Sequence, residues 1–154
     1  TFEWISLETI VETILQVLVQ RVSQKKIQVE LEGLSSVELF ADRRQIYQVI
    51  FNLILNSIQA VKPEDGRLII SAKPTEDSLQ IVFADNGMGI EEGDLGKIFT
   101  PFFTTKDKGT GLGLAISRRM MEDHHVKISF ESERGMGSTF TLTLPKYRLK
   151  QVVS

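Results

Sequence analysis

The sequence has 154 residues and no cysteine, and this absence excludes several kinds of site. A disulfide framework, a cysteine-ligated zinc ion and a thiol nucleophile are all impossible without that residue. The two histidines, His124 and His125, are adjacent, which leaves little for a histidine-based metal site or catalytic triad. Basic side chains number 18 and acidic ones 20, so the net charge is −2 and the chain is not suited to tracking a nucleic-acid backbone.

The sequence also lacks a segment that could cross a membrane or direct secretion. The longest uncharged run, residues 45–61, contains five amide side chains, so it is no membrane span. The first twelve residues carry three glutamates and no basic cluster, unlike a signal peptide. We therefore expect a cytoplasmic protein without membrane contact.

Composition and length indicate one soluble globular domain over residues 1–154. Hydrophobic residues make up 42% and charged residues 25%, close to the globular average. A chain of this length can bury one substantial core. It starts without Met in a strand-like segment, FEWI, so we expect it to be part of a longer protein.

Hydrophobic spacing predicts an alternation of helices and strands. Long helices are expected at about 7–22, 42–61 and 112–122, with a short one at 91–99. Ser6 and Asp42 are expected N-caps, with Gln45 as the capping-box partner of Asp42. Strands are expected at 27–31 and 37–41 around a Gly33 turn, at 67–73 and 79–84, and at 127–132 and 138–144, joined at Gly135 and Gly137 as a hairpin. The predicted fold class is α/β, a two-layer sandwich whose mixed, mostly antiparallel sheet is covered on one face by three helices.

The second long helix carries a stripe of uncharged amides. At about 100° per residue they fall within roughly 80° of one another. They are Gln45, Gln48, Asn52, Asn56 and Gln59. A stripe facing water would normally include Lys or Glu, so a polar internal pocket is the preferred interpretation. Asn52 and Asn56 are four residues apart and lie on one face, where amide oxygens could hold a hydrated Mg²⁺.

A second candidate site follows the strand at 79–84, which ends at Asp85 and leads into Asn86-Gly87-Met88-Gly89-Ile90. Asn-Gly is a hairpin signal, but the next residues predict a helix and no partner strand. The alternative is a carboxylate that accepts a hydrogen bond from a ligand amine, while Gly87 and Gly89 admit a flat ring.

Glycines are concentrated in the second half of the chain, where 9 of the 11 lie between Gly87 and Gly137. The segment GTGLGL opens the third long helix, and backbone N–H groups at a helix start can bind phosphate. It matches neither the P-loop nor the G-x-G-x-x-G spacing. Before it, residues 100–110 form either a solvated loop or a phosphate-facing mobile lid. The polar residues expected there are Thr104, Thr105, Lys106 and Lys108.

Taken in order, these segments resemble the ATP-binding catalytic domain of sensor histidine kinases, within the GHKL or Bergerat-fold ATPases. QVIFNLILNSIQA is similar to the N box, DNGMGI to the G1 box and FTPFFTTK to the F box. GTGLGL is similar to the G2 box and GMGSTF to the final glycine motif. The resemblance covers nearly the whole chain.

The resemblance implies a nucleotide-binding role for each motif. Asp85 would accept the adenine amino group, and Gly87 and Gly89 would admit the ring. Ile90, with Ile81 and Phe140, would form apolar walls, although these side chains could equally be ordinary core. Thr139 would touch the adenine side through its hydroxyl group or a water molecule.

The phosphate and metal contacts are implied in the same way. Asn56 would ligate Mg²⁺, with Asn52 supporting the metal or the phosphates, and Lys106 would neutralise the γ-phosphate. Thr104 and Thr105 would belong to the lid. The backbone that wraps the phosphates would come from Gly109, Thr110, Gly111, Leu112, Gly113 and Leu114.

Some positions depart from the family pattern. Gln59 stands where many relatives have a phosphate-binding Lys, so the amide serves or Lys62 or Lys106 compensates. His124-His125-Val126 replaces the usual H-G-G. With Gln59 at this position and a short lid, the chain is most similar to the nitrogen-regulation (NtrB-like) kinases.

The expected activity is transfer of the γ-phosphate of ATP to a histidine, in two-component signalling. Hydrolysing relatives carry a Glu where this chain has Asn52, which is no general base at neutral pH. Neither histidine here is followed by Glu or Asp, so the acceptor should lie on a separate dimerisation domain. A response-regulator receiver domain is the expected further partner, with a monomeric fragment and a homodimeric parent. The alternative is an ATP-dependent clamp or nucleotide sensor without kinase activity.

Overall fold

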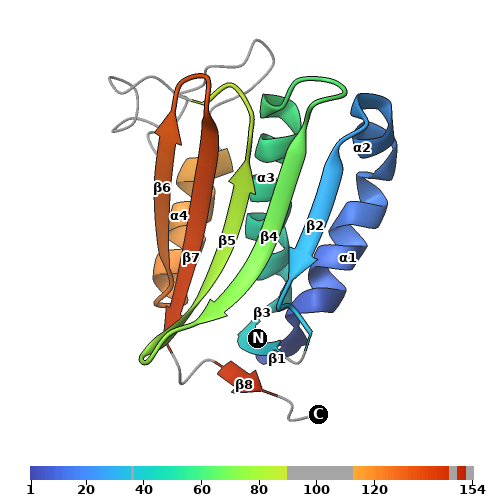
Figure 1. Ribbon diagram of the computed structural model, residues 1–154. Helices are drawn as coiled ribbons and strands as arrows, with labels where there is room; N and C mark the ends of the chain where they lie inside the picture. The colour runs from blue at the N-terminus through green and yellow to red at the C-terminus, as the bar shows by residue number, and fades with distance from the viewer. Residues whose placement is uncertain (36, 90–112, 146–148, 152–154) are drawn as a thin grey trace.

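The structure is a computed structural model that describes residues 1–35, 37–89, 113–145 and 149–151. In this part of the chain, four helices lie on one face of a five-stranded sheet, and a three-stranded sheet lies at one end (Figure 1). The predicted two-layer α/β sandwich is confirmed, with one helix more than expected. No helix of the described residues is long and apolar enough to cross a membrane.

The larger sheet has the strand order β2-β4-β5-β7-β6. Its strands are β2 (Gln28–Glu32), β4 (Arg67–Pro74), β5 (Ser78–Asp85), β7 (Gly137–Pro145) and β6 (Lys127–Glu133). The β2–β4 pair is parallel and the other three pairs are antiparallel, as the mixed pattern predicted. The hairpin of β6 and β7 is confirmed, with Gly135 and Gly137 both at positive φ.

The smaller sheet has the order β1-β3-β8. Its strands are β1 (Phe2–Ser6), β3 (Val37–Asp42) and β8 (Leu149–Gln151). The strands predicted on either side of Gly33 are both present, but they do not pair with each other, because β2 and β3 belong to different sheets. Gly33 does turn the chain, at φ 70°. A side chain at this position would also be too close to β4, because a Cβ would lie 2.8 Å from the Ala72 carbonyl oxygen.

The first predicted helix is two helices, α1 (Leu7–Val17) and α2 (Val19–Lys25). Ser6 caps α1 as predicted, because its Oγ accepts from the Thr9 N–H at 3.2 Å. The chain leaves helical geometry at Leu18, with φ −95° and ψ 10°, although this side chain is buried. Apolar periodicity continues across the break, so spacing alone could not locate it.

Helix α3 (Arg43–Ala60) is the central helix, with seven buried residues along it. Asp42 caps it as predicted, because its Oδ1 accepts from the Arg44 and Gln45 N–H groups at 3.1 and 3.2 Å. The predicted capping box is not completed by Gln45. The Asp42 N–H instead donates to Nε2 of His124, just after α4 (Gly113–Asp123), at 3.1 Å.

Candidate functional site

The candidate site is built around the end of β5. Alternate side chains of this strand, Leu79, Ile81 and Phe83, are buried in the core. Asp85 continues the row and is only 9% exposed. Its Oδ1 accepts from the Gly87 N–H at 2.8 Å, which fixes the carboxylate at the strand end. Period-two alternation therefore places a carboxylate where a core side chain would otherwise lie.

The loop after Asp85 packs against the last turn of α3. The Met88 N–H donates to the Ala60 carbonyl at 3.0 Å. A Cβ at Gly87 would lie 2.7 Å from the Ala60 backbone, so only glycine fits this approach. Asn56 is one helical turn before Ala60. Asp85 and Asn56 therefore lie at the same end of the α3–β5 layer.

Asn86 does not form the hairpin turn that Asn-Gly would otherwise indicate. Its Oδ1 accepts from the Arg67 N–H at 2.7 Å and its Nδ2 donates to the Asp65 carbonyl at 2.8 Å. The Asn86 N–H also donates to the Arg67 carbonyl at 3.3 Å. These bonds fasten the loop to the start of β4 and leave Asp85 on the helix side.

The amide stripe of α3 is divided between a helix contact and the surface. Asn52 and Asn56 are half-buried, and Nδ2 of Asn52 donates to Oγ of Ser117 on α4 at 3.3 Å. Gln59 is exposed, and Gln48 lies on an open groove of about 510 Å³ along the first half of α3. The two asparagines and Gln45 are thus half-buried, whereas Gln48 and Gln59 are exposed.

The predicted contact of Thr139 with the base is not supported by the strand register. Thr139 pairs with Ala84, whereas Asp85 pairs with Ser138. Successive side chains leave a sheet on opposite faces, so Thr139 points away from the face that carries Asp85. Ser138, which pairs with Asp85, lies on that face; it is 8% exposed and its Oγ lies 2.9 Å from Oγ of Ser132.

Ser57 is a further polar residue that the sequence interpretation did not select. It lies on α3 and is 1% exposed, and its Oγ has no hydrogen-bond partner among the described residues. The sequence feature that could have identified it is its hydroxyl group on an otherwise apolar helix face, which is formed by Val49, Ile50, Leu53 and Ile54. A buried hydroxyl without a partner is unfavourable, so this position calls for a bound group or a water molecule.

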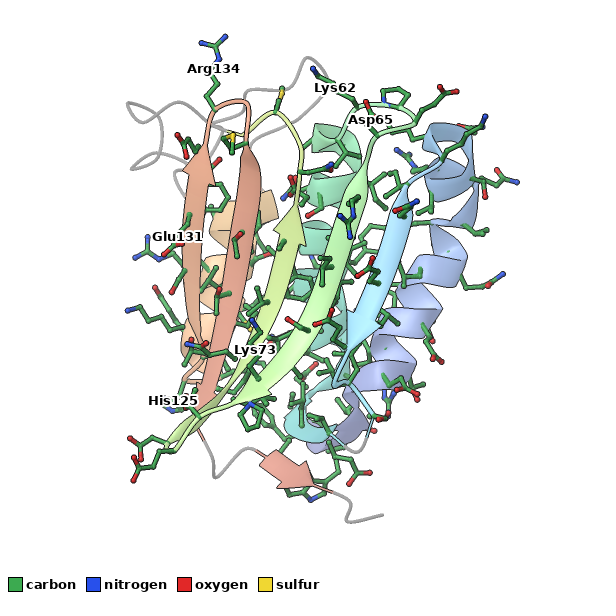
Figure 2. All side chains as sticks on the ribbon, viewed as in Figure 1. Lys62, Asp65, Lys73, His125, Glu131 and Arg134 are labelled. Atoms are coloured by element: carbon green, nitrogen blue, oxygen red, sulfur yellow. The ribbon has the colours of Figure 1, made fainter. Side chains whose placement is uncertain are left out.

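One basic residue predicted to compensate for Gln59 lies at the same end. Figure 2 shows Lys62 with Asp65 and Arg134 at the end of the molecule where the Asp85 loop runs, and His125 at the other end. Lys62 is exposed beyond the last turn of α3. The described structure thus offers a cation next to the amide helix.

Outside the described residues lie Ile90, Thr104, Thr105, Lys106, Lys108, Gly109, Thr110, Gly111 and Leu112, together with the short helix predicted at 91–99. Gly113 and Leu114 form the first residues of α4, as the prediction of a helix opening there requires.

Residues 41–148 match the family model described as histidine kinase-, DNA gyrase B- and HSP90-like ATPase. The catalytic domain of histidine kinase ThkA superposes with a TM-score of 0.83 at 32% identity, over 95% of this chain and 96% of that one. The chain belongs to this ATPase family and is a catalytic domain of the histidine kinase type. The predicted family is therefore confirmed.

Curated relatives of this catalytic domain are longer proteins. Sensor histidine kinase ZraS of Escherichia coli K12 is 39% identical over 142 residues, which cover 92% of this chain and 30% of that protein. Sporulation kinase B of Bacillus subtilis 168 is 33% identical over 143 residues, covering 93% and 33%. The chain thus spans about a third of the length of these relatives. Its similarity to the nitrogen-regulation group stays a prediction.

Proposed function

We propose that this domain binds Mg-ATP at the Asp85 end of α3 and donates the γ-phosphate to a histidine on a separate domain. The observation that carries the proposal is the buried Asp85 carboxylate, held beside the last turn of the amide helix. Membership of an ATPase family supports the use of ATP. The whole chain, residues 1–154, would act as one catalytic module of a longer cytoplasmic kinase.

The base would be recognised by hydrogen bonds at the buried end of the site. The adenine amino group would donate to Asp85, a charge-assisted bond worth about 1.5–3 kcal/mol. Ser138 lies beside Asp85 on β7, and Ser57 has a buried hydroxyl to offer. Gly87 and Gly89 keep the adjoining loop close to α3 and to the β6–β7 turn, because a Cβ at either would overlap backbone there.

The donor set fits a magnesium ion that arrives with the nucleotide. No three His, Cys, Asp or Glu side chains in the described ranges come together to hold a metal ion. Mg²⁺ is commonly bound by one or two protein oxygens, with phosphates and water completing its shell. Asn56 would supply a protein oxygen, and the bound ion would neutralise phosphate charge. Outside the described residues, Lys106, Thr104, Thr105 and the backbone of 109–114 would complete the phosphate contacts.

Asn52 favours transfer over hydrolysis. Its amide is no general base at neutral pH, and its Nδ2 already donates to Ser117. Phosphoryl transfer depends mainly on positioning and charge neutralisation, so an acceptor supplied from elsewhere suffices. Asn52 would orient the phosphates or the metal from this fixed position.

The two histidines of the chain are poorly suited to be that acceptor. His124 is buried; its Nε2 accepts from Asp42, and its Nδ1 lies 2.9 Å from the Met120 carbonyl oxygen. His125 lies at the end of the molecule away from Lys62 and Asp65 (Figure 2). The acceptor would therefore be a histidine on the dimerisation domain of a homodimeric parent.

A response-regulator receiver domain would receive the phosphate next. ThkA, whose catalytic domain this chain resembles, has been solved in complex with the response regulator TrrA. The isolated domain is expected to be a monomer.

The test of nucleotide binding is Asp85→Asn, measured by titration calorimetry with Mg-ATP. We expect the dissociation constant to rise by about tenfold or more, since about 1.4 kcal/mol corresponds to one decade. Asp65→Asn is the matched control, because it removes the same charge from an exposed position at the same end. Equal affinity of the Asp85 variant and the wild type would remove the adenine assignment.

The second candidate, an ATP-dependent clamp or nucleotide sensor, is separated by a labelling experiment. Radiolabelled ATP with a supplied dimerisation domain should leave acid-labile phosphate on that domain, and none on this chain alone. Tight binding without any transfer would favour the clamp or sensor. Label on this chain alone would overturn the assignment of the acceptor to another domain.

A further inference from the structure

Helix α3 ends without a basic residue of its own and without a left-handed glycine. Its last turn has no basic residue, and its C-cap, Val61, is extended at φ −81° and ψ 152° instead of a left-handed glycine. At the C-cap, the Val61 N–H donates to the Ser57 carbonyl at 3.3 Å. The last carbonyl groups of a helix need partners from outside when the chain turns away like this.

Those partners are supplied by one ammonium group and one loop amide. Nζ of Lys25, at the end of α2, donates to the carbonyl oxygens of Ile58, Gln59 and Val61 at 2.9, 3.3 and 3.0 Å. The intervening carbonyl, that of Ala60, accepts from the Met88 N–H at 3.0 Å. An ammonium group has three donors, so Lys25 uses its full capacity here.

The lysine is held in place from its own backbone. Its carbonyl accepts from the Glu64 N–H at 2.6 Å, so the turn after α3 is fastened to the end of α2 at a second point. Lys25 is half-buried, and its positive charge lies at the negative end of the α3 dipole. The arrangement fixes the path of the chain from Ile58 to Glu64.

We infer that Lys25 is a positioning residue for nucleotide binding, acting through the last turn of α3. The loop that carries Asp85 rests on that turn through Met88 and Gly87, and Asn56 lies one turn before Ala60. Loss of the ammonium leaves three carbonyls without their donor and frees the turn to shift. Such a shift changes the spacing between Asp85 and Asn56, although Lys25 touches neither. This inference rests on the proposed function.

The binding test compares Lys25→Met with Lys26→Met. Both changes remove one positive charge at the same helix end, but Lys26 is exposed and bonds only loosely to Glu64, at 3.5 Å with both side chains 71% exposed. We expect Lys25→Met to raise the Mg-ATP dissociation constant about tenfold at unchanged stoichiometry, and Lys26→Met to leave it within about twofold. Lys25→Arg keeps the charge on a planar group and should fall between them.

Three results would overturn the inference. Unchanged affinity of the Lys25 variant, with only a lower melting temperature, would show a purely structural role. An equal loss in both Met variants would show a general effect of charge. If Lys25→Arg bound Mg-ATP as weakly as Lys25→Met, the hydrogen bonds donated to the end of α3 would not be the cause of the wild-type affinity.

Hydrogen exchange of the Met88 amide tests the same inference without nucleotide. We expect its protection to fall at least about fivefold in Lys25→Met or, if that variant does not fold, in Lys25→Arg, while the Phe83 amide in β5 keeps its protection. Unchanged Met88 protection would overturn the positioning role. A wild type that binds no ATP would defeat the proposed function, and the exchange measurement would then still show whether Lys25 holds the Met88 loop on α3.

Discussion

Ser57 shows how one atom can connect stability with ligand binding. Its hydroxyl is buried on the apolar face of α3 without a partner among the described residues. Burying an unpaired polar group costs about 1–3 kcal/mol. A helix that retains such a group at the end next to Asp85 is less stable than it could be. We interpret the cost as the consequence of a polar site that nucleotide or water completes.

The variant Ser57→Ala should therefore move stability and affinity in opposite directions. We expect an unfolding free energy about 1 kcal/mol higher without nucleotide, a melting temperature about 2–4 °C higher, and Mg-ATP affinity about two- to tenfold lower. Calorimetry and thermal denaturation measure the two effects. Ser71→Ala is the control, because Ser71 is also buried but lies on the other face of the sheet. It pairs with Val82, whose side chain leaves the sheet on the face opposite to Phe83 and Asp85. Unchanged affinity in Ser57→Ala would assign the hydroxyl no role in the site.

At the scale of an element, the end of α4 explains how this chain replaces the family's glycine turn. His125 adopts φ 58°, in the left-handed region. Its N–H donates to the Glu122 carbonyl at 3.0 Å, and the Val126 N–H donates to the Met121 carbonyl at 2.8 Å. This pair of bonds is the Schellman motif, in which glycine is the preferred residue. His125 therefore occupies the left-handed position of this motif, where glycine would carry no strain.

The variant His125→Gly should accordingly stabilise the domain. Relief of the left-handed strain, less the entropy cost of glycine, gives about 0.5–1 kcal/mol, or a melting temperature about 1–4 °C higher. Thermal denaturation measures the gain, and Mg-ATP affinity should not change. His125→Ala keeps the strain and loses only the ring, so it should show no gain. A rise in both variants would trace the effect to the imidazole instead of the backbone.

At the scale of the whole molecule, Asp42 joins three separate parts of the chain. In the isolated domain its Oδ2 lies 3.1 Å from the Thr1 ammonium group, its Oδ1 caps α3, and its N–H donates to His124 behind α4. In this isolated domain, the hydrogen bond from the Thr1 ammonium group, followed by those from the Gln45 and Arg44 N–H groups, lowers the pKa of the Asp42 carboxyl below its usual value. A lowered pKa in the folded state means that the ionised carboxylate stabilises the fold.

The lowered pKa of Asp42 makes the stability of the fold fall as the pH becomes acidic. The contribution is present above the unfolded-state pKa of about 4, and it is lost as the pH falls through that value and the lower pKa of the folded state. Asp42→Asn keeps a capping oxygen but cannot ionise, so its deficit in melting temperature should shrink between pH 7 and pH 3. Asp77→Asn, in the exposed β4–β5 turn, is the control. A deficit that is constant with pH would contradict the assignment to the charge.

The sequence predicted some parts of the site because their signals are local. The N-caps Ser6 and Asp42, the amide stripe and the end of β5 at Asp85 follow from short-range spacing and side-chain chemistry. Thr139 lies on the face opposite to Asp85, and period-two alternation with Phe140, Leu142 and Leu144 already indicates this; the family resemblance, and not the strand pattern, suggested Thr139. Lys25 and Ser57 were missed because a lysine before a turn and a serine within a helix have no distinctive pattern.

By itself, the sequence determined the fold class, the family and the residue types of the site, because hydrophobic periodicity and ordered motifs are properties of the chain. Only the tertiary structure decided which hydroxyl lies beside Asp85, which partner completes the cap at Asp42, and what holds the end of α3. Each of these contacts joins residues far apart in sequence, from Lys25 to Ile58 or from Asp42 to His124. Such pairs are selected by packing, which brings together groups whose separation along the chain carries no signal.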